Sequence, residues 1–143
     1  MYAELEQAII AKFKAATPPI YREQRDQFAR TLPILALLSV VLVAVLGGWL
    51  SAVILLVQSL VESPAIAGGL LLTPFFWLTL LPPILWAGSY FPLRARRLAG
   101  WRLFVGGTLL SLVGSLLTLS LINILFSGAI LYFTLQCYDE FYR

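Results

Sequence analysis

The sequence predicts an all-α integral membrane protein, in which an N-terminal amphipathic helix precedes four membrane helices arranged as two helical hairpins. Of its 143 residues, 60% are apolar and only 12% are charged, whereas an average soluble domain has roughly 25% charged residues. Glu62 is the only charged residue between Thr31 and Leu93, and residues 103–138 contain none. A small soluble core cannot bury so many apolar residues, so we exclude a soluble domain, a disordered chain and a nucleic-acid-binding protein.

Residues 1–30 form a polar and basic segment, which we expect to be cytoplasmic, ahead of a membrane domain at 31–143. Within the first 16 residues, Leu5, Ile9 and Phe13 recur at steps of four, which is the spacing of one face of a helix. A pair of prolines then ends this helix, because the residue before a proline avoids helical angles. Two interpretations stay open: the helix lies in the membrane interface, or it packs against a partner or the protein's own loops.

The first two membrane segments are predicted at 33–61 and 65–91. As a helix, the first would be about 44 Å long, so it must tilt or extend into the headgroups of a membrane with a core of roughly 30 Å. Ser63 and Pro64 suit the N-cap and the first position of the second helix. Prolines inside a helix remove a hydrogen bond and kink it. The prolines that we expect to kink the second segment are Pro74, Pro82 and Pro83.

The last two membrane segments are predicted at 103–118 and 121–137. The uncharged stretch that contains them is too long for one membrane crossing, at about 51 Å, but just long enough for two. We place a tight turn between them, where polar residues cluster around Ser120. A shallow re-entrant hairpin that never crosses the membrane is the alternative.

Small and hydroxylated residues recur on single faces of three of these segments. Such residues let helices approach closely and form hydrogen bonds within a membrane. We expect the faces of the third and fourth segments to meet, and we keep a narrow polar path along their seam as the alternative. The predicted packing residues are Ala44, Gly48 and Ala52 in the first segment, Thr108, Ser111, Ser115 and Thr118 in the third, and Ser120, Asn123 and Ser127 in the fourth.

Basic residues predict the orientation. One short loop holds four arginines, and cytoplasmic loops are enriched in such residues. Both termini are therefore expected on the cytoplasmic side of a bacterial inner membrane or a thylakoid-type internal membrane, with interfacial aromatic residues such as Trp101 and Tyr138 at that boundary. The arginines can also hold anionic lipid headgroups or dock an acidic partner. They are Arg94, Arg96, Arg97 and Arg102.

The sequence offers few groups for catalysis. It has no histidine and a single cysteine, Cys137, so the usual zinc ligands and nucleophile–histidine pairs cannot be assembled. We therefore predict no enzyme activity, no cofactor and no metal. Glu62 is the one candidate ionisable site within the apolar region, although its position at a turn equally suits a solvated loop carboxylate.

The C-terminal hairpin carries a weak resemblance. The stretches Gly100–Phe104, Leu116–Ile122 and Leu131–Gln136 resemble the terminal hairpin of a broad group of small, uncharacterised bacterial integral membrane proteins. In that group an arginine usually follows the glutamine, where this chain has Cys137. The resemblance covers about 40 residues and implies a hairpin, but no activity and no site residues.

These observations predict a non-enzymatic accessory, scaffold or assembly subunit that packs against other membrane chains. One alternative is a membrane-shaping homo-oligomer that uses the amphipathic helix and the hairpins. The other is a small transporter or channel, because broken helices mark many transport sites. The expected partners are membrane lipid and other membrane chains or further copies of this one.

Overall fold

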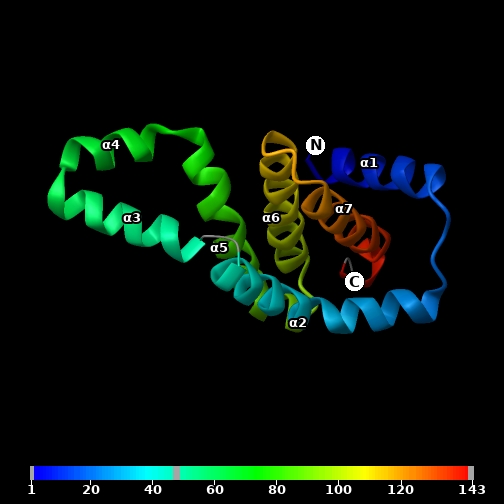
Figure 1. Cartoon of the computed structure of the whole chain (residues 1–143). Helices are drawn as coiled ribbons and strands as arrows, with labels where there is room; N and C mark the ends of the chain where they lie inside the picture. Colours follow the sequence, from blue (N-terminus) through cyan, green and yellow to red (C-terminus); the bar gives the residue numbers. More distant parts are fainter. Residues whose placement is uncertain (1, 47–48, 142–143) are drawn as a thin grey trace.

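The computed structural model describes residues 2–46 and 49–141, which form eight helices and no strand (Figure 1). The prediction of an all-helical chain is confirmed for these residues. The helices are α1 (Tyr2–Ala16), α2 (Arg22–Leu46), α3 (Trp49–Glu62), α4 (Pro64–Leu72), α5 (Pro74–Arg94), α6 (Leu98–Leu117), α7 (Leu121–Gln136) and α8 (Tyr138–Phe141).

Two of these helices, over Arg22–Val43 and Leu98–Leu117, are long and apolar enough to cross a membrane. The bent pair α4 and α5 makes a third candidate if it counts as one span. Two shorter apolar helices cover Ala52–Glu62 and Leu121–Gln136. The fold is thus compatible with a membrane protein.

The segment predicted as one long helix at 33–61 is divided between α2 and α3. Residues 47–48, which separate them, lie outside the described residues.

The segment predicted at 65–91 bends sharply at Thr73, where α4 and α5 meet at 73°. Two side chains bond carbonyls that the break frees: the Thr73 hydroxyl donates to Gly69 O at 3.0 Å, and Trp77 Nε1 donates to Leu71 O at 2.8 Å. These local bonds are what a break in an apolar helix requires. The helix breaks at Pro74, whereas α5 continues as one helix through the other prolines. The kinks that we expected at Pro82 and Pro83 do not divide the helix.

As predicted, α4 begins at Pro64 with Ser63 as its N-cap residue, although the Ser63 hydroxyl forms no capping hydrogen bond.

The turns that end α5 and α6 have the same geometry. Arg96 and Leu119 both adopt a φ of 51°, a left-handed conformation that usually favours glycine. In each turn the next amide reaches back five residues, from Arg97 N to Pro92 O at 2.8 Å and from Ser120 N to Ser115 O at 3.0 Å. These are Schellman-type ends, and the second forms the α6–α7 turn near the position predicted for it.

The closest packing lies between α5 and α6. A β-carbon on Gly100 would come within 2.4 Å of Leu93 N, and one on Gly107 would come within 2.9 Å of the Trp86 ring. Glycine at these two positions therefore sets the distance between the helices. The buried core around them includes Leu32 of α2, Phe104 of α6 and Phe141 of α8. We call this assembly of α2 and α5–α8 the helix cluster.

Helices α3 and α4 extend together away from the helix cluster (Figure 1), and we call them the arm. Ser59 and Ala67 are buried, but most of the large apolar side chains of the arm are exposed. They are Ile54, Leu55, Val57, Leu60, Val61, Ile66, Leu71 and Leu72.

The amphipathic helix α1 is fastened to the C-terminal helices by three hydrogen bonds, which we call the clasp. Lys14 Nζ donates to Asp139 Oδ2 at 2.7 Å. Gln136 Nε2 donates to Thr17 Oγ1 at 2.8 Å, and the Tyr132 hydroxyl donates to the Pro18 carbonyl at 2.8 Å. The first helix therefore packs on its own chain, while its position in the membrane interface stays a prediction.

The apolar face of α1, from whose spacing the helix was predicted, is only partly covered. Phe13 meets Tyr132 edge-on, with ring centroids 6.0 Å apart. Leu5 and Ile9 stay about 60% exposed, while the neighbouring Ile10 is buried. The helix is thus packed on one side and open on the other.

Two aromatic residues expected at the membrane boundary are buried. Trp101 is 3% exposed and Tyr138 is 4% exposed, and their ring centroids lie 4.9 Å apart. Trp101 Nε1 donates to Thr134 O at 2.8 Å. This bond and the aromatic contact hold both side chains inside the helix cluster, and their position at the membrane boundary stays a prediction.

Candidate functional site

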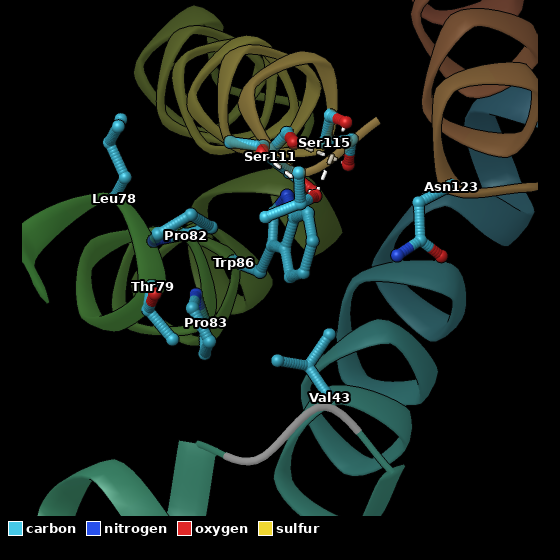
Figure 2. A pocket seen from close by; sticks show the side chains of 11 residues that line it. Val43, Leu78, Thr79, Pro82, Pro83, Trp86, Ser111, Ser115 and Asn123 are labelled. Atoms are coloured by element: carbon cyan, nitrogen blue, oxygen red, sulfur yellow. Dashed lines mark hydrogen bonds between the residues drawn. The ribbon is translucent and has the colours of Figure 1, made fainter. Parts of the chain in front are cut away.

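Two adjoining cavities of about 350 and 290 Å³ lie between α2, α5, α6 and α7. Both are lined by Val43, Trp86, Ser111 and Asn123. Figure 2 shows the Trp86 indole at the centre of this arrangement, with Ser111 and Ser115 of α6 on one side and Asn123 of α7 across the space. Pockets for small molecules have volumes of roughly 300–1,000 Å³, so the two cavities together are of a suitable size.

The hydroxyl groups of α6 bond mainly within their own helix. Thr108 donates to Phe104 O at 2.9 Å, Ser115 to Ser111 O at 2.8 Å, and Thr118 to Gly114 O at 3.1 Å. Serine and threonine in helices often bond back to the carbonyl four residues earlier. Thr108 also accepts a hydrogen bond from Trp86 Nε1 at 3.3 Å, which links α6 to α5.

The expected contact between the polar faces of α6 and α7 is therefore replaced by another arrangement. Thr108 faces α5, while Ser111 and Asn123 line the same cavities from opposite helices. Ser127 is buried and Ser120 is the half-buried N-cap residue of α7. The structure thus gathers much of the predicted polar set around a space rather than along a closed seam.

Pro82 and Pro83 explain part of the polarity of this space. Neither has an amide proton, so neither can bond the carbonyl four residues earlier in α5. Those carbonyls belong to Leu78 and Thr79, and both residues line the larger cavity. Every residue lining the two cavities is uncharged, so the site is suited to hydrogen bonding with an uncharged group.

The predicted arginine cluster forms ion pairs with distant acids of the same chain. Arg96 lies 2.9 Å from Asp26 and 4.0 Å from Glu140, and Arg102 lies 2.6 Å from Glu6. Arg94 and Arg97 are exposed. Sequence reasoning missed these pairs because the partners are up to 96 residues apart.

Glu62 is exposed at the tip of the arm. It is the last residue of α3 and accepts a hydrogen bond from Gln58 Nε2 at 3.2 Å. A shallow groove of about 390 Å³ runs along this side of α3. Its lining residues are Val53, Ile54, Val57, Gln58, Val61 and Glu62.

Only part of the small-residue face predicted in the first segment falls within the described residues. Gly48 lies outside the described residues, as does the side chain of Ala44, and Ala52 is half-buried. A second small-residue face lies on α4, where Ala65 and Gly69 are four residues apart and exposed, and the exposed C-cap residue Thr73 follows them. A β-carbon added at Gly69, or at Gly68, would meet nothing within 4 Å. The spacing of this face was visible in the sequence, but its exposure was not.

No protein-family model, no curated protein and no solved structure matches this chain. The proposals below therefore depend on the residues of the chain and their arrangement.

Proposed function

We propose that this protein is a non-enzymatic accessory or assembly subunit that packs against another membrane chain through its arm. The observation that carries this proposal is the open small-residue face of α4, formed by Ala65 and Gly69 with Gly68 beside them. Between helices in a membrane, small residues allow the backbones to approach closely.

Helix α6 of the same chain has glycines that are covered by a neighbouring helix. Gly100 and Gly107 on α6 are covered by the backbone and the Trp86 side chain of α5. The glycines of α4 have the same chemistry but no cover. A helix from a second chain would cover the glycines of α4, as α5 covers those of α6.

Helix α3 carries a polar pair of its own near the tip of the arm. Gln58 and Glu62 form a hydrogen bond at the edge of the apolar groove on α3. Polar side chains in a membrane hydrogen-bond across helix interfaces. The arm thus offers a close-packing face on α4 and a polar group at the tip of α3.

We also propose that all four apolar segments predicted from the sequence enter the membrane, with both termini cytoplasmic. The ion pairs Arg102–Glu6 and Arg96–Asp26 support this orientation, because they hold the N-terminal segment and the arginine loop at the same end of the molecule. A bacterial inner membrane or a thylakoid-type internal membrane suits the positive charge of that end.

The test is the mass and composition of the particle that contains this chain after gentle extraction from its native membrane. We expect other membrane proteins in fixed ratio with the wild-type chain. Gly69→Leu should weaken their association by roughly tenfold or more, since the new side chain occupies the docking face. The fold itself should tolerate the change, because nothing lies within 4 Å of that site.

Gly88→Leu is the matched control, since Gly88 is also a helical glycine with nothing within 4 Å, but it lies outside the arm. Equal association of wild type and Gly69→Leu would refute docking through α4. A chain that is extracted alone, as a homo-oligomer, would refute the accessory role. The polar cavities around Trp86 would then favour a small transporter or channel.

A further inference from the structure

We propose that the groove between α1 and the α6–α7 hairpin binds one acyl chain of an anionic phospholipid from the surrounding leaflet. The groove has a volume of about 540 Å³, which falls within the roughly 300–1,000 Å³ of small-molecule pockets. This site rests on the proposed topology, in which α6 enters the membrane from its cytoplasmic end. It is independent of any partner of the arm.

The walls of the groove are apolar and come from three helices. Leu5 and Ile9 line it from α1, Leu109 from α6, and Leu131 and Leu135 from α7. Leu5 and Ile9 are 60% and 59% exposed, although the clasp holds α1 against the protein. The apolar side of α1 therefore faces a space that the protein's own side chains leave unfilled.

Two arginines and the carboxylate of Glu6 lie at one end of the groove, which leaves a net positive charge for a lipid phosphate. Arg102 lies on the rim, where its side chain is half-exposed and bonds Glu6 through two nitrogens, at 3.3 and 2.6 Å. Arg97, the exposed N-cap residue of α6, stands one turn before the groove residue Trp101. Arginine is the side chain best suited to bind a phosphate with two parallel hydrogen bonds.

The direction of α6 matches a lipid that enters from the cytoplasmic leaflet. Trp101, Val105 and Leu109 all line the groove and follow one another at steps of four residues, which is about 12 Å along the helix. A phosphate at Arg97 and Arg102 would therefore place an acyl chain alongside these residues, pointing toward the membrane interior.

Trp101 is a suitable reporter, because it is almost fully buried and lines the groove. The full-length chain with Trp49, Trp77 and Trp86 changed to phenylalanine would be reconstituted in phosphatidylcholine vesicles. Small amounts of phosphatidylglycerol or phosphatidylcholine with brominated acyl chains would then be added as quenchers. We expect brominated phosphatidylglycerol to quench Trp101 at a several-fold lower mole fraction than brominated phosphatidylcholine.

Two sets of variants separate the acyl chain from the headgroup. Leu109→Phe fills the groove and should reduce quenching by both lipids, whereas Leu116→Phe, at an exposed position on the same helix outside the groove, should leave it unchanged. Arg97→Gln together with Arg102→Gln should remove the preference for phosphatidylglycerol. No quenching, or equal quenching by both lipids, would overturn the proposal.

A second measurement does not depend on the triple tryptophan variant. Wild-type protein after gentle detergent extraction should retain about one anionic phospholipid per chain, and Leu109→Phe should retain several-fold less. Equal retention by the two proteins would also overturn the proposal.

Discussion

The helix cluster and the arm are built from the same kinds of residues, yet among the described glycines only two of the cluster lie tightly against a neighbouring helix. In the cluster, Gly100 and Gly107 lie so close to α5 that a β-carbon would overlap it. In the arm, Gly68 and Gly69 face open space. Because lipid is as apolar as leucine, burial of apolar surface does not favour helix association in a membrane. The close backbone approach of α5 and α6 at Gly100 and Gly107 therefore distinguishes this helix pair from the arm, where the described glycines are open as Gly88 and Gly128 are in the cluster.

Hydrogen bonds differ between the two regions in the same way. In the cluster, indole groups join separate helices, from Trp86 to Thr108 and from Trp101 to Thr134. At the base of the arm, Trp77 bonds Leu71 across a break in the chain. The cluster is thus joined between helices, whereas bonds of the arm maintain its own bend.

The largest effect that would test this comparison comes from the same substitution in both regions. Gly100→Ala should destabilise the protein by roughly 3 kcal/mol, at the upper end of the usual cost of overpacking, because the new carbon meets the backbone of Pro92 and Leu93. Gly69→Ala should change stability by less than about 1 kcal/mol, and in the stabilising direction. Unfolding in mixed detergent micelles, followed by circular dichroism, measures both. Equal effects would show that the packing of the two regions does not differ.

An intermediate effect is expected from removing an indole donor. Trp101→Phe should cost about 1–2 kcal/mol, because Thr134 O loses a buried hydrogen bond and the contact with Tyr138 weakens. Trp77→Phe should leave the stability of the cluster nearly unchanged and instead increase amide hydrogen exchange near Thr73. Faster exchange throughout α6 in the Trp77 variant would mean that the arm and the cluster unfold as one unit.

The smallest effect is expected at the charged end. Glu6→Gln removes the ion pair with Arg102, and exposed pairs contribute at most about 1 kcal/mol. We expect somewhat faster protease cleavage in the connection between α1 and α2, and a smaller difference from wild type at high salt, where such pairs are screened. Matching cleavage rates at low salt would mean that the clasp alone holds α1.

Local features of the fold were predictable from the sequence. Apolar composition predicted the helical class, and proline positions predicted the start of α4 at Pro64 and the bend at Pro74. These features depend on residues that are neighbours in the sequence. The burial of Trp101 and the pairing of Arg102 with Glu6 were not predictable. Both depend on contacts between residues far apart in the sequence, which helical periodicity does not encode.

The polar site was predictable in part, for a related reason. The spacing of Thr108, Ser111 and Ser115 correctly placed them on one side of α6, but it did not indicate their hydrogen-bond partners. A hydroxyl in a helix has its own carbonyl within reach, so it does not require a neighbouring helix. The cavity between Ser111 and Asn123 arises from the packing of several helices and has no signature in the sequence.

The clasp has a consequence for how this chain is made. It joins Lys14 to Asp139, which lie 125 residues apart. At a synthesis rate of roughly 5–20 residues per second, α1 is complete for about 6–25 s before its partner leaves the ribosome. During that interval the walls that α7 supplies to the groove beside α1 are not yet in place. The order of synthesis thus makes the attachment of the first helix to the last ones a late step, which only the finished chain can complete.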